Sequence, residues 1–173
     1  MVVSLLKYLI IILVLLIIFV ILYIYDNYQK LLDILENINT SKGKIDEILD
    51  KKKEYLEKLS NDSKEKELKI MLKEETTNIF SKEDMLFNVR WKLEDLINDK
   101  KYTPEKEYKD YYERLKTLEE DLEGLKDYYN SKVILYNEKY LNKVFCNIYK
   151  MLKLDKQKKF KLRKIESFEI LKD

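Results

Sequence analysis

Histidine is missing from this chain of 173 residues. Without an imidazole there is no histidine general base, no Ser-His-Asp or Cys-His arrangement, and no Glu-x-x-His ligand set for a di-iron bundle. Two glycines are too few for a phosphate-cradling loop, and the single cysteine, Cys146, excludes an internal disulfide and a multi-thiolate metal site. We therefore predict a protein that is not an enzyme, with no catalytic residues, cofactor, metal or small-molecule substrate.

Alanine is also absent, which bears on the long apolar run over residues 8–25. As an α-helix this run spans about 27 Å, close to the thickness of a bilayer's hydrocarbon core. A cleaved secretory signal would need a shorter run followed by small residues of the A-x-A kind, but this run leads into Tyr23, Ile24, Tyr25 and Asp26. The sequence predicts a short tail over residues 1–7 and a retained single-pass transmembrane helix over residues 8–25, with the lipid bilayer as its first partner.

The lysines near this run predict its orientation. Lys7 precedes the run, whereas Lys30, Lys42 and Lys44 follow within twenty residues. Basic residues concentrate on the cytoplasmic side of membrane helices, and an acid such as Asp26 has little influence. The count favours a cytoplasmic location for the C-terminal bulk of the chain.

Helical periodicity dominates the sequence beyond the run. An apolar stripe with heptad spacing, interrupted by Lys42 and Lys52, continues the membrane helix to about residue 59. A second stripe runs from Leu68 to about residue 100. Thr103 and Pro104 are typical of an N-cap and first helical residue, so a third helix is expected from there to about residue 148.

Striped helices joined by short loops bury their stripes against each other. We therefore predict an all-α fold: a transmembrane helix continuing into an antiparallel bundle over residues 26–150, with three long helices and a short C-terminal fourth. In this up-down-up arrangement Lys100, Lys101 and Tyr102 are expected near the lipid head groups. The tail over residues 151–173 is expected some 50 Å from the membrane.

Charge is balanced along the chain, with 34 Lys and Arg against 32 Asp and Glu, which gives no general attraction to nucleic acid. The tail is the exception. Its cations are spaced among apolar residues, which favours a short amphipathic helix docked on the bundle. The alternative is contact with a polyanion through Lys156, Lys158, Lys159, Lys161, Arg163 and Lys164.

A repeated Tyr-Asn pair lies in the third predicted helix, after a Tyr-x-Pro turn at Tyr102–Pro104. Glu119 and Leu122 precede the pairs, and Phe160 follows them. In this order and spacing the chain resembles the LemA family of bacterial membrane proteins, although Tyr102 and Pro104 are not adjacent and Lys143-Val144 replaces a Phe-Pro. The matching residues are Tyr129, Asn130, Val133, Tyr136 and Asn137.

The resemblance implies a single-pass membrane protein with an external N-terminus and no attached catalytic activity. From the residues themselves, Asn130 and Asn137 lie seven positions apart on one helix face. Amides beside an apolar seam can hydrogen-bond a facing helix and fix its register. A groove for a partner is the functional alternative.

The function that these patterns favour is a non-enzymatic scaffold or interaction protein of the bacterial cell envelope, with another membrane or envelope protein as partner. The alternative is a membrane-tethered binder of nucleic acid or another polyanion through the basic tail, although the balanced charge disfavours nucleic acid. Self-assembly into an oligomer by coiled-coil pairing is compatible with both, but charged Lys42 and Lys52 oppose a long homotypic coiled coil.

Overall fold

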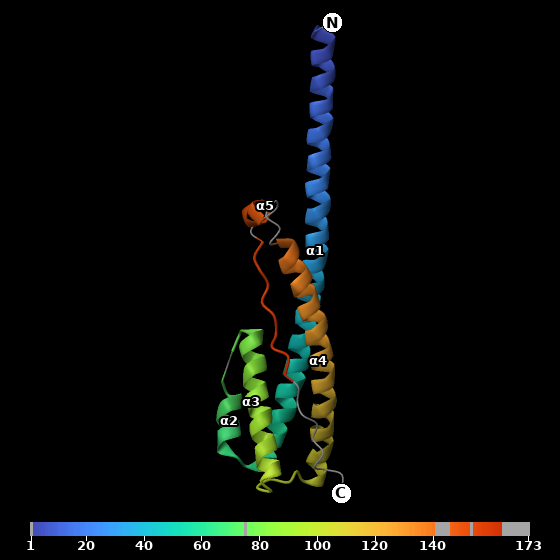
Figure 1. The fold of residues 1–173 in the computed structure, drawn as a ribbon. Coiled ribbons are helices and arrows are strands. Elements are labelled where there is room, and N and C mark those ends of the chain that lie inside the picture. The colour runs from blue at the N-terminus through green and yellow to red at the C-terminus, as the bar shows by residue number, and fades with distance from the viewer. Residues whose placement is uncertain (1, 75, 141–145, 153, 164–173) are drawn as a thin grey trace. The chain divides into compact units, whose positions relative to one another are not determined.

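The computed structural model describes residues 2–74, 76–140, 146–152 and 154–163, and the regular structure among them is helical, which confirms the predicted all-α fold. The helices, labelled in Figure 1, are α1 (Val2–Ser63), α2 (Lys66–Leu72), α3 (Ile79–Asn98), α4 (Lys106–Tyr140) and α5 (Cys146–Met151).

Two compact units make up the chain. The first unit combines Met1–Asn39 with Ser131–Lys158, and the second combines Thr40–Asn130 with Lys159–Asp173. These units cut across the predicted boundaries at residues 25 and 150, because α1 and α4 each contribute to both.

In the first unit, the apolar run is the exposed part of α1. Its large side chains are 44–71% exposed from Tyr8 to Tyr25, apart from the partly buried Ile24. Among the described residues, α1 alone is long and apolar enough to cross a membrane. The helix continues without a break to Ser63, so the predicted continuity beyond the run is confirmed.

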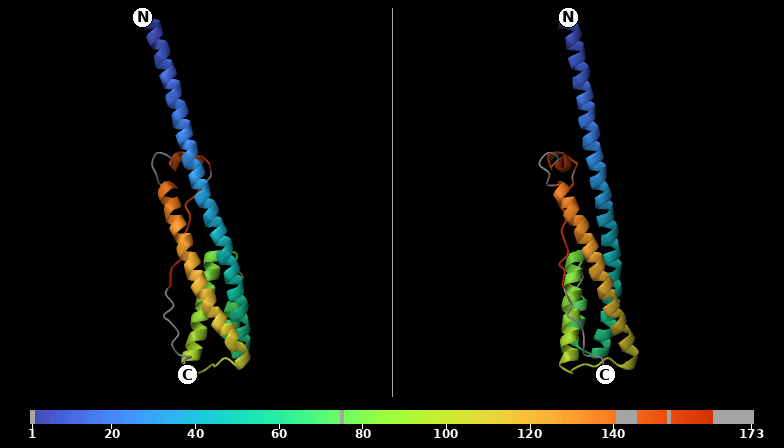
Figure 2. Two further views of the ribbon diagram at one scale, coloured as in Figure 1. Left: turned by 90° about the vertical axis from the view of Figure 1, so that its right-hand side faces the viewer. Right: turned by 45° about the vertical axis from the view of Figure 1, so that its right-hand side comes forward.

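The core of the first unit lies between α1 and the end of α4. Leu31 and Ile38 of α1 are fully buried, as are Val133 and Tyr136 of α4, and Tyr140 is nearly so. Figures 1 and 2 show the two helices side by side and running in opposite directions within this unit. Both stripes repeat every seven residues, which keeps the buried face of each helix turned toward the other.

The second unit packs the later part of α1 against α2, α3 and the first part of α4. Heptad-spaced side chains from every helix form its core. The heptad stripe predicted for α1 placed Lys42 on the buried face, but in the structure Ser41 is buried and Lys42 is exposed. The fully or nearly buried apolar residues on these helices are Ile45, Leu49, Leu56, Leu59, Leu68, Leu72, Ile79, Leu86, Val89, Leu93, Ile97, Tyr112, Leu115, Leu122 and Tyr129.

The predicted second helix is divided. The chain turns at Lys64, with a φ of 59°, forms α2, and then leaves helical geometry before α3. Asn78 explains the new start, because its side chain accepts a hydrogen bond of 2.9 Å from the Phe80 amide. The β-branched Thr76 and Thr77 just before it also favour non-helical backbone.

Tyr102, expected with Lys100 and Lys101 near lipid head groups, has a partner on α1. Because α2 and α3 form a hairpin, α3 ends where α1 ends, and the Tyr102 hydroxyl lies 2.5 Å from the Asp62 carboxylate. Asp62 is at the end of α1 remote from the apolar run. Within the second unit, Tyr102 is therefore fastened to the last turns of α1.

Helix α4 begins at Lys106, two residues later than Pro104 predicted. The Glu105 carbonyl accepts the first hydrogen bonds, from the amides of Tyr108 at 2.8 Å and Lys109 at 3.2 Å. The structure describes α4 as far as Tyr140 and α5 from Cys146, so the predicted continuation to residue 148 stays a prediction. Residues 141–145 lie outside the described residues.

The tail is extended where a helix was expected. Residues 154–163 contain no helix, and the short C-terminal helix, α5, precedes them. Residues 154–158 belong to the same unit as the apolar run, and the expected separation of 50 Å stays a prediction. Residues 164–173 lie outside the described residues.

Candidate functional site

Two asparagines of α4 hold the extended tail. In the first unit the Asn137 amide nitrogen donates to the Gln157 carbonyl at 2.9 Å, and the Gln157 amide donates to the Asn137 side-chain oxygen at 3.0 Å. Since a carboxamide carries both a donor and an acceptor, one side chain satisfies both backbone groups of the residue it faces.

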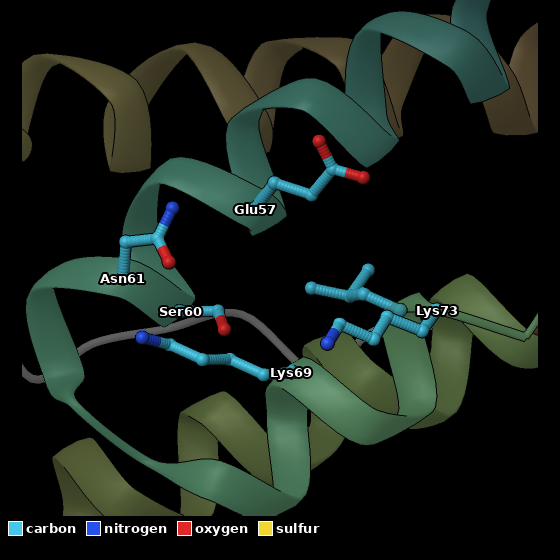
Figure 3. Close-up of a pocket in the computed structure, with 6 residues that line it drawn as sticks. Glu57, Ser60, Asn61, Lys69 and Lys73 are labelled. Carbon is cyan, nitrogen blue, oxygen red and sulfur yellow. The ribbon is translucent and has the colours of Figure 1, made fainter.

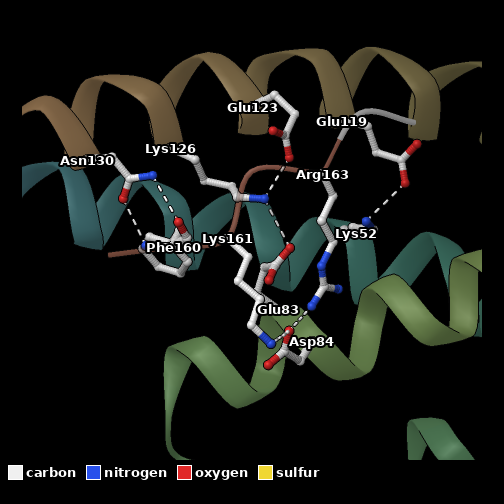
Figure 4. Close-up of polar contacts among 10 residues, drawn as sticks. All are labelled: Lys52, Glu83, Asp84, Glu119, Glu123, Lys126, Asn130, Phe160, Lys161 and Arg163. Carbon is white, nitrogen blue, oxygen red and sulfur yellow. Dashed lines mark hydrogen bonds and ion pairs between the residues drawn. The ribbon is translucent and has the colours of Figure 1, made fainter. Parts of the chain in front are cut away.

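The second unit repeats this arrangement. The Asn130 amide nitrogen donates to the Phe160 carbonyl at 2.9 Å, and the Phe160 amide donates back to the Asn130 oxygen at 2.8 Å. Figure 4 shows this reciprocal pair. We call Asn130, Asn137 and the backbone of Gln157 and Phe160 the asparagine clamp. The sequence predicted the two asparagines, but their partner is an extended, irregular segment and not a facing helix.

The spacing of the clamp follows from two backbone geometries. Seven residues of α-helix rise about 10.5 Å, and three residues of extended chain span about 10 Å. Asn130 and Asn137 are seven apart, whereas Gln157 and Phe160 are three apart and pair in the reverse order. A Tyr-Asn pair repeated every heptad therefore matches every third residue of an extended segment that runs in the opposite direction.

An aromatic socket in the second unit receives the Phe160 side chain, which is only 4% exposed. Its ring centroid lies 4.4 Å from that of Phe80 and 5.0 Å from that of Tyr129, which it meets edge-on. Such ring pairs add to the stabilisation that burial provides. Tyr129 is itself 1% exposed, and burial raises the pKa of its hydroxyl.

Two of the six predicted polyanion contacts are used within the second unit. Arg163 forms an ion pair with Asp84 and places its guanidinium 4.1 Å from the centre of the Phe87 ring. The Lys161 amine lies 3.6 Å from the same carboxylate, although Lys161 itself is mostly exposed. Lys156, Lys158 and Lys159 are exposed, and Lys164 lies outside the described residues.

Charged residues occupy core positions of the second unit, which sequence reasoning missed. Lys52 of α1 lies 2.9 Å from Glu119 of α4, and Glu119 also contacts Arg90 of α3 at 3.3 Å. Arg90 pairs in turn with Glu94, which accepts a hydrogen bond of 2.9 Å from the Tyr112 hydroxyl. All five side chains are nearly buried, at 2–6% exposed. These five residues are the buried charge cluster.

Lys126 forms a second buried set. Its amine lies 3.1 Å from Glu83 of α3 and 2.6 Å from Glu123 of α4 (Figure 4). The sequence carried a usable signal, because Glu83 and Arg90 alternate with Leu86 and Leu93 in one heptad stripe. A charge at such a position must either be paired or be reached by water.

The contacts of the buried charge cluster indicate a role in aligning the helices. Each carboxylate of the cluster contacts a cation or a hydroxyl, and the described residues contain no group of three or more acids or cysteines that could hold a metal ion. Burying charges is costly even when they pair. In return, a misaligned helix would leave a buried charge without its partner, so the cluster favours one register.

The Tyr-x-Pro turn is fastened to α1. Asp62 accepts hydrogen bonds from the Tyr102 hydroxyl and, at 3.4 Å, from the Glu105 amide. Burial raises the pKa of the Tyr102 hydroxyl strongly, and the hydrogen bond to Asp62 raises it further. Tyr102 therefore stays protonated and donates to the carboxylate.

A hollow of about 220 Å³ lies between the end of α1 and α2 (Figure 3). Glu57 and Asn61 line it from α1, opposite Lys69 and Lys73. It is open to solvent and mixes both signs of charge, so its chemistry points to no particular ligand.

Compared with protein-family models, with curated proteins and with solved structures, the chain has no match.

Proposed function

We propose that this chain is a single-pass, membrane-anchored protein without enzymatic activity, and that its helical bundle is a scaffold for another membrane or envelope protein. The observation that carries the proposal is the continuity of α1. One unbroken helix contains both an apolar run whose large side chains are mostly 44–71% exposed and a heptad stripe with fully buried residues.

The exposure of the run supports the membrane anchor. Every large side chain from Tyr8 to Val20 is at least 44% exposed, and an 18-residue stretch has a mean hydropathy of 3.2. Soluble monomers rarely expose contiguous apolar surface on this scale. A bilayer would cover it at no cost in backbone hydrogen bonds, since a helix satisfies these internally.

The use of the polar side chains supports a non-enzymatic role. The buried charge cluster and the asparagine clamp are both occupied by groups of the chain itself. The resemblance to the LemA family belongs to the same proposal, and with it a bacterial origin.

The exposed apolar residues of the second unit suggest where a protein partner binds. Trp91 of α3 is 61% exposed and Ile70 of α2 is 70% exposed. Tryptophan is enriched among the residues that dominate binding energy at protein interfaces. We propose the face of α3 that carries Trp91 as the contact surface.

Site-specific photocrosslinking of the full-length protein in its native cells tests the proposal. A photoreactive residue at Asn88, which is exposed one turn before Trp91, is expected to capture a discrete membrane protein. Trp91→Ala should reduce that product severalfold. A photoreactive residue at Lys51, exposed on α1, is the matched control.

Three results would count against the proposal. Extraction of the full chain by alkaline carbonate would contradict the anchor. Crosslinking from Asn88 that is insensitive to Trp91→Ala would contradict the contact surface. Recovery of nucleic acid in a manner that depends on residues 156–164 would instead favour the polyanion-binding alternative.

A further inference from the structure

A short helix with exposed apolar side chains shares the first unit with the apolar run. It is α5, and Leu152 directly follows it. Met151 is 84% exposed and Leu152 is 46% exposed, with Lys150 exposed beside them. We call Lys150, Met151 and Leu152 the α5 edge. These apolar side chains are therefore not part of the buried core of the unit.

The packing of the first unit indicates how far the end of α4 lies from the apolar run. Leu31 and Ile38 of α1 are seven residues apart, as are Val133 and Tyr140 of the antiparallel α4. Antiparallel pairing of Val133 with Ile38 would align Tyr140 with Leu31. Leu31 follows Tyr25, the end of the apolar run, by six residues, or about 9 Å of helix. The end of α4 thus lies about one and a half helical turns from that boundary.

Both sides of α5 are held at this level. Before it, Tyr140 is buried in the unit's core, and after it Gln157 is fixed to Asn137 by two hydrogen bonds. In each view of Figures 1 and 2, α5 lies beyond the end of α4 and level with the light-blue part of α1, where the run ends.

We infer that the α5 edge rests on the lipid surface and forms a second membrane contact. This inference depends on the proposed membrane anchor. Apolar side chains enter the boundary between head groups and acyl chains, while lysines extend toward anionic phosphates. Met151 and Leu152 supply the first feature, and Lys150 with the exposed Lys156 supplies the second. Lipids with a net negative charge are the expected occupant.

The inference also bears on orientation. Lys150 and Lys156 are far from the apolar run in sequence, but the fold places them in the same unit. They add to the lysines that follow the run directly, on the side for which the positive-inside tendency predicts the cytoplasm.

Fluorescence quenching of the full-length protein in vesicles tests the inference. Cys146→Ser removes the native thiol, and single cysteines at Met151, Ile70 or Val14 carry a bimane label. Ile70→Cys is the matched control, because Ile70 is also exposed and apolar but lies in the second unit. The vesicles contain phosphatidylcholine with brominated acyl chains, with or without phosphatidylglycerol.

Fluorescence at positions 14 and 151 is expected to fall by roughly half relative to unbrominated vesicles, with little change at position 70. Phosphatidylglycerol should increase quenching at position 151, and Lys150→Glu should remove that increase. If Cys146→Ser lowers the helical content, a fluorescent amino acid at position 151 of the native chain replaces the label.

The contradicting results are distinct. Quenching at position 14 but not at position 151 would overturn the inference and leave the anchor in place. A photocrosslink from position 151 to a protein would have the same meaning. No quenching at position 14 would overturn the proposed function itself. Quenching at 151 that ignores both phosphatidylglycerol and Lys150→Glu would contradict the selection of anionic lipid.

Discussion

The two halves of the asparagine clamp share one bonding pattern but differ in their surroundings. Asn130 is 8% exposed, and the residue that it holds, Phe160, is enclosed by Phe80 and Tyr129. Asn137 and its partner Gln157 are only half-buried. Because water competes for the second pair and not for the first, the same two hydrogen bonds should contribute unequally to stability.

The comparison separates two roles within one motif. The two asparagine amides determine which residues of the extended tail face α4. Burial of the Phe160 ring in the aromatic socket supplies most of the free energy that holds the tail against α4. The expected loss of unfolding free energy therefore decreases in the order Phe160→Ala, Asn130→Ala, Tyr102→Phe and Asn137→Ala.

Phe160→Ala should cause the largest loss, about 3–5 kcal/mol of unfolding free energy, because it empties a buried aromatic site. Urea unfolding of the detergent-solubilised protein measures the loss, and trypsin cleavage after Lys158 and Lys159 should become faster. Leu162→Ala is the control, since Leu162 is 55% exposed and its truncation should have little effect. Equal losses for the two variants would refute the socket.

Asn130→Ala should cost about 2–3 kcal/mol, because it leaves the buried amide and carbonyl of Phe160 without partners. Hydrogen exchange of the Phe160 amide should accelerate together with global unfolding. Exchange that stays slow would mean that another group satisfies this amide.

Tyr102→Phe removes a hydrogen bond to a carboxylate and should cost about 2 kcal/mol at neutral pH. The folded state raises the pKa of Tyr102 above its unfolded value near 10, so its contribution is present below that pH and decreases as pH rises past it. Thermal melting from pH 7 to 11 should show the difference between the wild type and Tyr102→Phe narrowing above pH 10. A constant difference would contradict this account.

Asn137→Ala should have the smallest effect, about 1 kcal/mol, since water can reach the Gln157 backbone. Comparing its unfolding free energy with that of Asn130→Ala tests the comparison directly. Losses of equal size would show that burial does not distinguish the two halves of the clamp.

The periodic parts of the fold could be predicted from the sequence. The apolar run and the stripes of α1 and α4 specify helices because their spacing allows few alternatives. The break between α2 and α3 was hidden, since Leu72 and Ile79 are seven residues apart and keep the stripe in phase across it.

The site was predictable in its residues but not in its partners. Heptad spacing placed Asn130 and Asn137 on one face, yet it could suggest only another helix opposite them. That an extended segment lies there depends on where the chain returns after α5. The buried charge cluster was missed because charges on helices are usually solvated, and only the fold decides that Lys52 meets Glu119.

The asparagine clamp also fixes the number of residues between Gln157 and Phe160. Shifting the extended segment by three residues would keep both sets of backbone hydrogen bonds but place Gln157 or Arg163 in the position that Phe160 occupies. An insertion or deletion of one residue between Gln157 and Phe160 would break the match between seven helical and three extended residues. The length of this short segment is therefore as strongly constrained as its composition, and the chain should tolerate substitutions at its exposed positions far better than any change in their number.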